Sequence, residues 1–178
     1  KDWKLENINV SKYNTGAHVD VVNGSDFTIR TGDLGFEADL ENHKVYQTID
    51  LPAGAYMFSA HYGNYEGDAD GCYLVVGNGN SLPDTKDLSK AFAYKAMESK
   101  SNASQNDLFF VLTEPATISL GILANLAGQQ CLSIKSFTLT QYPLSKMEGL
   151  VDTINGATID TPASINAHPI YDLSGRRV

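Results

Sequence analysis

The chain has 178 residues, and its 13 lysines and arginines against 21 aspartates and glutamates give a formal net charge of −8. This sign repels the phosphates of nucleic acid and the anionic surface of a bilayer, so a nucleic-acid partner is disfavoured. The length suits one domain with a core, and no apolar run approaches the roughly 18 residues of a membrane-spanning helix. We therefore expect no membrane insertion and a chain that begins after any leader peptide.

Segments rich in β-branched and aromatic residues, separated by Gly, Asn, Asp and Pro, predict strands as far as Tyr142. The expected strands cover residues 3–10, 19–22, 27–31, 44–51, 55–62, 72–76, 91–95, 108–113, 117–123 and 131–142. Between 44–51 and 55–62, Pro52 and Gly54 suit a β-turn, which predicts a hairpin.

Alternation with a period of two assigns one apolar face to this pair of strands. That face carries Ile49, Leu51, Tyr56, Phe58, Ala60 and Tyr62. In the last strand the alternation shifts by one residue near Lys135 and Ser136, which predicts a β-bulge. Many short strands without a long helix between them favour an all-β fold, a two-sheet antiparallel β-sandwich of the jelly-roll type with Phe137 and Leu139 also in the core.

The pattern changes after Tyr142. Apolar residues recur at helical spacing from Leu144 to Ile154, and Ser145 with Glu148 fits a capping box, so a short helix is expected there. Residues 157–168 are small and polar, and residues 169–178 read as a strand that runs into a turn. We therefore divide the chain into a β-sandwich at 1–142 and a helix, linker and tail at 143–178.

Two cysteines leave two readings open. Cys72 and Cys131 have no metal-ligand spacing, and each lies within an apolar, strand-like segment. They are either buried free thiols or partners in a disulfide between neighbouring strands.

The sequence offers no catalytic constellation and no cofactor motif. Four histidines, at positions 18, 43, 61 and 168, form no metal-binding pattern, and no nucleophile signature surrounds either cysteine. The glycine-rich stretch 77–80 lacks the third glycine of a dinucleotide fingerprint and reads as a turn. The carboxylates at 33, 37, 39 and 41 act as a glycosidase pair only if the fold sets two of them across a cleft. We expect no enzyme.

The segment 62–71 is the most informative. Three carboxylates, Glu66, Asp68 and Asp70, lie within five residues among glycines, and their oxygens suit a structural calcium ion. The alternative is a solvated acidic loop.

The same segment contributes to a possible sugar site. Sugars are bound by flat aromatic faces together with amides and carboxylates that bind hydroxyl groups. Residues of these types near expected loops are Trp3, Asn64, Tyr65, Asp68, Tyr73 and Asn125. For Trp3 and Tyr73 the competing reading is packing at the core or its rim.

Two stretches resemble known families. Residues 45–60, followed by 118–122 and 134–139, resemble the galactose-binding-like jelly rolls, among them many non-catalytic carbohydrate-binding modules. Residues 170–178, Ile-Tyr-Asp-Leu-Ser-Gly-Arg-Arg-Val, are similar to the opening strand and turn of the C-terminal sorting domain of proteins exported by the type IX route. The first resemblance implies a glycan ligand, and the second implies a secreted or cell-surface location.

The expected function is that of a non-catalytic, carbohydrate-binding accessory module of an exported protein, either monomeric or part of a larger chain. The alternative is a structural or protein-contacting spacer on the cell surface, and the third reading is a glycoside hydrolase.

Overall fold

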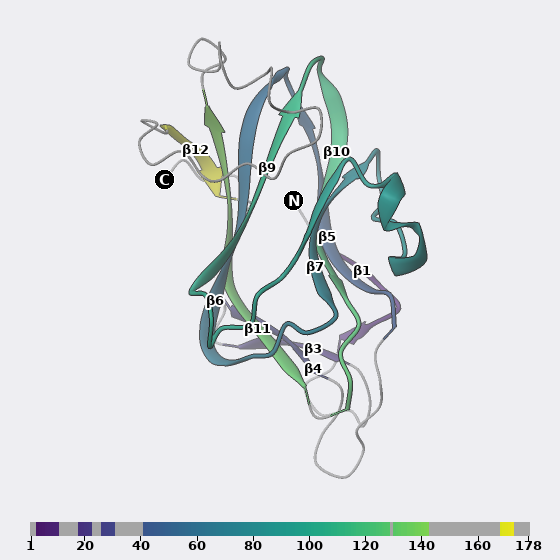
Figure 1. Cartoon of the computed structure of the whole chain (residues 1–178), viewed down its shortest axis with the longest axis vertical. Coiled ribbons are helices and arrows are strands. Elements are labelled where there is room, and N and C mark those ends of the chain that lie inside the picture. Colours follow the sequence, from purple (N-terminus) through teal and green to yellow (C-terminus); the bar gives the residue numbers. More distant parts are fainter. Residues whose placement is uncertain are drawn as a thin grey trace.

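The structure is a computed structural model (Figure 1). It describes the chain at residues 3–10, 18–22, 26–30, 41–128, 130–142 and 168–172. Side chains are described at 3–8, 41–63, 67–128 and 130–142.

Within the described residues, the first sheet has five strands in the order β1-β5-β10-β7-β8, all antiparallel to their neighbours. These strands are β1 (Lys4–Glu6), β5 (His43–Leu51), β10 (Ala116–Ala124), β7 (Cys72–Asn78) and β8 (Ala93–Ala96). Tyr46, Gly121 and Val75 stand in one row across β5, β10 and β7. Because β8 stands last in the strand order, it is an edge strand of this sheet as described.

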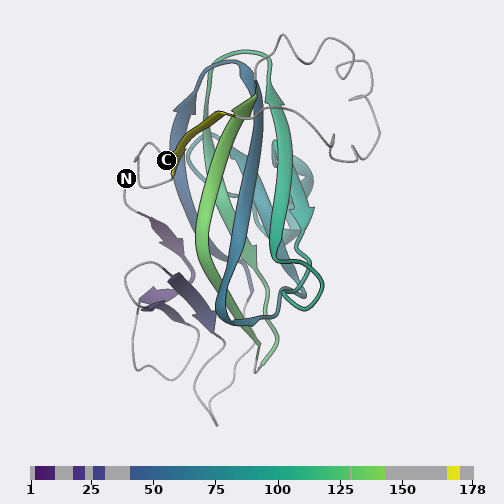
Figure 2. The ribbon, with the colours of Figure 1, turned by 90° about the vertical axis from the view of Figure 1, so that its left-hand side faces the viewer.

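The second sheet, which has seven strands in the part of the chain that the structure describes, packs against the first (Figure 2). Its main path is β2-β3-β4-β11-β6-β9, and β12 joins the side of β11. These strands are β2 (Asn9–Val10), β3 (His18–Val22), β4 (Asp26–Arg30), β11 (Cys131–Tyr142), β6 (Gly54–Gly67), β9 (Gln105–Leu112) and β12 (His168–Asp172). The predicted all-β fold of two antiparallel sheets is confirmed, with one parallel pair between β2 and β3.

The core lies between the two sheets and contains the side chains that alternation places on the inner faces. Tyr56, Phe58, Phe137 and Leu139 are buried there, and the ring of Phe58 stacks on that of Phe137 with centroids 5.5 Å apart. Ile49, which is expected on the same buried face, is half-buried at the margin of this cluster. The interior is a continuous apolar layer.

The predicted hairpin between β5 and β6 is wrong. Strand β5 pairs with β1 and β10 in one sheet, and β6 pairs with β9 and β11 in the other. Pro52 and its neighbours therefore carry the chain from one sheet to the other, and the Tyr56 hydroxyl fixes the turn by donating to the Pro52 carbonyl at 2.8 Å. Both strands turn an apolar face to the core, a pattern that fits a crossing between sheets as well as a hairpin.

The single strand expected at 3–10 is divided between the two sheets. The break is at Asn7, whose φ of 60° is left-handed and whose side-chain amide donates to the Asn42 carbonyl at 2.9 Å. The predicted β-bulge is confirmed, because the register between β11 and β6 shifts between Ile134 and Ser136. The expected helix at 144–154 lies outside the described residues.

A second apolar cluster lies on the outer face of the five-stranded sheet. It consists of Tyr46, Val75, Leu82, Leu88 and Leu123, with Tyr73 and Ala91 packed against it. Residues 82–91, which include the 3₁₀-helix η1 (Thr85–Lys90), cover this cluster and project from that sheet in Figure 1.

A buried lysine, paired with two partly exposed carboxylates, fastens this cover to the sheet. The Lys44 ammonium lies 2.8 Å from an Asp84 carboxylate oxygen and 3.2 Å from Glu6, and the Lys44 side chain is only 8% exposed. The Tyr46 hydroxyl also donates to Glu6. Burial alone lowers the pKa of Lys44, but hydrogen bonds to the two carboxylates raise it above its usual value overall.

Cys72 and Cys131 are both buried and free. The structure therefore agrees with the reading of two buried thiols and not with that of a disulfide. Burial raises the pKa of the Cys72 thiol to about 12. No helix in the described part of the chain has the length and apolar character needed to cross a membrane.

Candidate functional site

A wide bulge in strand β6 forms one wall of the candidate site. Tyr62 stands opposite Ile134 of β11, and Gly67 stands opposite Leu132, so five residue steps on β6 match two steps on β11. Residues 63–66 therefore arch away from the ladder. Such bulges redirect side chains and are common beside functional sites.

The segment 97–104, which joins β8 to β9, is fastened to both ends of this arch. The Lys100 backbone amide donates to the Gly67 carbonyl at 2.8 Å, and the Lys100 ammonium donates to the Gly63 carbonyl at 2.6 Å. The Tyr62 amide donates to the Ser104 carbonyl at 3.2 Å. Lys100 thus bridges the two ends of the bulge and fixes its shape.

Glycine is required at position 67 because the chains approach each other closely. A Cβ atom there would lie 2.5 Å from the Cβ of Lys100 and 2.9 Å from the Tyr62 ring. Both contacts are shorter than carbon atoms tolerate, so any larger residue would push the segment 97–104 away from β6.

A buried polar group holds the Tyr62 ring in place. The Tyr62 hydroxyl donates to the Glu98 carbonyl and accepts from the Asn106 side-chain amide at 3.1 Å. Asn106 is 1% exposed and also bonds both the amide and the carbonyl of Glu98, at 2.8 and 3.0 Å. Burial, with neighbouring negative groups, raises the pKa of Tyr62 to about 12, although the Asn106 bond opposes it. The phenol therefore stays neutral at physiological pH.

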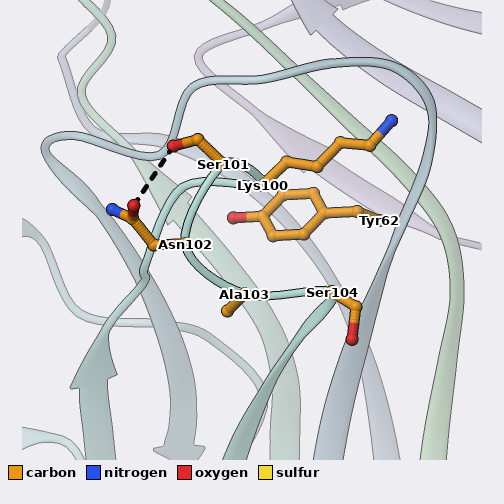
Figure 3. Close-up of a pocket in the computed structure, with 6 residues that line it drawn as sticks. All are labelled: Tyr62, Lys100, Ser101, Asn102, Ala103 and Ser104. Atoms are coloured by element: carbon orange, nitrogen blue, oxygen red, sulfur yellow. Dashed lines mark hydrogen bonds between the residues drawn. The ribbon is translucent and has the colours of Figure 1, made fainter.

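Between the Tyr62 ring and the segment 100–104 lies an open cavity of about 370 Å³ (Figure 3). Its walls are Tyr62, Lys100, Ser101, Asn102, Ala103 and Ser104. In Figure 3 the segment curls around the ring, with Ser101 and Asn102 to one side and Ser104 to the other. The volume is at the lower end of the range for small-ligand sites, about 300–1,000 Å³. The cavity combines one aromatic ring with hydroxyl and amide groups.

The structure places the predicted site residues in several locations. Asn64, Tyr65 and Glu66 belong to the bulge beside the cavity, and their side chains lie outside the described residues. Asp68 is exposed just beyond the bulge, where its amide donates to the Cys131 carbonyl at 2.9 Å. The segment predicted as a loop from 62 onward is therefore strand as far as Gly67.

Tyr73 and Trp3 lie apart from the cavity. Tyr73 is half-buried on the outer face of the five-stranded sheet, next to Tyr94. Trp3 is 37% exposed and packs on Phe137 with ring centroids 5.0 Å apart, so it covers the rim of the core.

Asn125 links three other segments of the fold by side-chain hydrogen bonds. Its side-chain oxygen accepts from the Asn42 backbone amide at 2.8 Å. Its side-chain NH₂ group donates to the Thr85 hydroxyl at 2.6 Å and to the Gly71 carbonyl at 3.3 Å. Every polar atom of the side chain thus has a partner in the chain, which makes Asn125 a structural residue.

Among the residues whose side chains are described, no three carboxylate, imidazole or thiolate groups gather as a metal site. Asp68 and Asp70 are both exposed. The third expected calcium ligand, Glu66, has no described side chain, so the calcium hypothesis stays a prediction.

Sequence reasoning missed the residues of the segment 97–104. The available signal was the run Ser-Lys-Ser-Asn-Ala-Ser-Gln-Asn at 99–106, whose polar composition marks a loop rich in hydroxyl and amide groups. Its contact with β6 comes from the fold, because the two segments are about 40 positions apart in the sequence.

Residues 1–121 match the model of a protein family, the domain of unknown function DUF5013. The chain belongs to the DUF5013 family. The matched range contains the bulge and all the residues that line the cavity, so the candidate site is part of the DUF5013 region. Neither the curated proteins nor the solved structures gave a match to the chain.

Proposed function

We propose that this chain is a non-catalytic carbohydrate-binding module and that the cavity beside Tyr62 receives a sugar ring. The supporting observation is the composition and shape of that cavity. The Tyr62 ring, 8% exposed, forms part of the wall, and Ser101, Asn102 and Ser104 add hydroxyl and amide groups to the lining. In Figure 3 the side chains of Ser101 and Asn102 point toward each other, on the side away from the ring. A pyranose combines C–H patches, which pack on an aromatic face, with hydroxyl groups, which bond to hydroxyl and amide groups.

The chemistry of the cavity favours a neutral or weakly basic ligand. The net charge of −8 works against strongly anionic glycans, and the one cation in the cavity wall, Lys100, directs its ammonium to the Gly63 carbonyl. Among the lining residues whose side chains are described, none carries a carboxylate, imidazole or thiol that could act as a general acid, base or nucleophile. This composition supports the proposal of binding without catalysis.

The affinity should be modest, because a site of this kind combines one stacked ring with a few hydrogen bonds that compete with water. We expect about −4 to −7 kcal/mol, or a dissociation constant between roughly millimolar and ten micromolar. In its parent protein the module would hold an exported chain, at the cell surface or outside it, against a polysaccharide.

The test is affinity electrophoresis of the full chain through gels that contain xylan, galactomannan, laminarin, hydroxyethylcellulose or starch. We expect retardation by at least one polysaccharide and its loss in Asn102→Ala. The matched control is Asn80→Ala, an equally simple change at an exposed turn remote from the cavity. No retardation by any polysaccharide would favour the spacer, and release of reducing ends on incubation would favour a glycoside hydrolase.

A further inference from the structure

Two neighbouring tyrosines form an exposed aromatic surface on the five-stranded sheet. Tyr94 on the edge strand β8 is 47% exposed, one of the most exposed large apolar side chains in the described part of the chain. Its ring lies 6.4 Å from that of the half-buried Tyr73 on β7, nearly edge-on at 68°. We refer to these two residues as the tyrosine pair.

The register places both tyrosines on the outer face. Val75 stands opposite Tyr94, and Ala96 stands opposite Tyr73, so the two rings are diagonal neighbours. Because the side chain of Ala96 is small, it projects little from the sheet beside the Tyr73 ring. Residues 82–91 cover the apolar cluster on this face, with Tyr73 at its margin and Tyr94 outside it. The tyrosine pair is thus the uncovered margin of that cluster.

Strand β8 leads from the tyrosine pair directly to the cavity wall. Tyr94 lies about 7 Å along β8 from Ala96, the last residue of the strand, at the usual rise of about 3.4 Å per residue. The next residues, 97–104, form the segment whose end lines the cavity. The strand that carries Tyr94 is thus continuous in sequence with the segment that lines the cavity.

The charges along this edge favour the same class of ligand as the cavity. Lys95 and Glu98 flank the path, and their charged groups lie 3.8 Å apart, so the pair adds no net charge. A tyrosine offers a flat apolar face with a polar tip, which suits stacking against a pyranose ring that also carries hydroxyl groups.

We propose that the site binds a linear, neutral oligosaccharide rather than a terminal monosaccharide, with one ring in the cavity and a more distant ring on Tyr94, supported by Tyr73. This inference rests on the proposed function and deepens it, since it assigns a second subsite and the polymeric nature of the ligand.

Calorimetry with xylo-, manno-, cello- and laminari-oligosaccharides, from mono- to hexasaccharide, tests the proposal. With the unmodified chain we expect one hexasaccharide to bind at least tenfold more tightly than the disaccharide of the same series. Tyr94→Ala should lower the hexasaccharide affinity about tenfold and leave the disaccharide affinity unchanged. Tyr94→Phe, which keeps the ring, should stay within about threefold of the unmodified chain.

The matched control is Phe92→Ala, because Phe92 is a similarly exposed aromatic residue, at 42%, whose ring turns toward Phe110 at the sheet edge. It should keep the dependence on chain length. The subsite is refuted, with the cavity proposal intact, if affinity does not depend on chain length or if Tyr94→Ala weakens all lengths equally. Absence of binding by every saccharide refutes both proposals.

Discussion

Asn106 holds the cavity wall, and its replacement by alanine is the sharpest structural perturbation that the site offers. The change removes three hydrogen bonds, two to the backbone of Glu98 and one to the Tyr62 hydroxyl. At about 1 kcal/mol net for each bond, and with the Glu98 amide left without its partner, we expect a loss of about 3–4 kcal/mol in the free energy of unfolding. Urea unfolding followed by circular dichroism measures it.

A second variant, Asn106→Asp, tests the same contacts through the pH dependence of stability. In Asn106→Asp a buried carboxyl group faces the Glu98 carbonyl, so its pKa in the folded state rises above the unfolded value of about 3.9. Its stability relative to the unmodified chain is therefore greatest below pH 4 and falls as the pH rises toward 7. The control is Gln105→Ala, an exposed neighbour that should change stability by less than about 0.5 kcal/mol. A loss below about 1 kcal/mol in Asn106→Ala, or a loss equal to that of the control, refutes the reasoning.

Three further predictions concern stability. Phe58→Ala should cost about 3–5 kcal/mol in denaturant unfolding, because Phe58 is fully buried, and a loss below about 1 kcal/mol contradicts the assigned core. The raised pKa of Cys72 predicts that stability is nearly constant up to about pH 8 and falls above it, by about 1.5–2 kcal/mol at pH 10; Cys72→Ala should remove this decline, and an unchanged decline contradicts the assignment. The acidic residues at 66–70 should bind calcium weakly at most, so millimolar calcium should leave the melting temperature nearly unchanged; a rise that Asp68→Asn with Asp70→Asn abolishes would establish a calcium site.

The strands could be predicted because half-buried strands alternate with a period of two. The partner of each strand could not. Residues 44–51 and 55–62 present apolar faces that suit either a hairpin or a crossing between sheets, and only the long-range pairing of β5 with β10 decides between them. Likewise, the break at Asn7 depends on a hydrogen bond to Asn42, which no local pattern shows.

For the candidate site, the sequence pointed to the bulge beside the cavity and missed the opposite wall. The bulge that carries Asn64 and Tyr65 stands beside the cavity, but Lys100 and the hydroxyl and amide groups that follow it arrive from a distant segment. Asn125 has the side chain of a sugar-binding residue, but its partners in the fold already satisfy its hydrogen-bonding groups.

The tyrosine in the bulge offers a test of that neighbourhood. Tyr65→Ala should weaken saccharide binding about tenfold or more and leave stability nearly unchanged, as measured by calorimetry and thermal unfolding of the same sample. Unchanged affinity would remove the bulge from the site and leave the segment 100–104 as its binding wall.

Amide chemical-shift mapping tests the central claim most directly. The ¹⁵N-labelled full chain would be titrated with xylohexaose, mannohexaose, cellohexaose and laminarihexaose, and one-dimensional ¹H spectra of the same samples would report the anomeric protons of any new reducing ends. We predict that at least one hexasaccharide shifts the amides of Ser101, Asn102, Ser104 and residues 63–67, with no cleavage of the saccharide. Shifts confined to another face, cleavage of the saccharide, or no shift with any of the four would contradict a non-catalytic sugar site in this cavity.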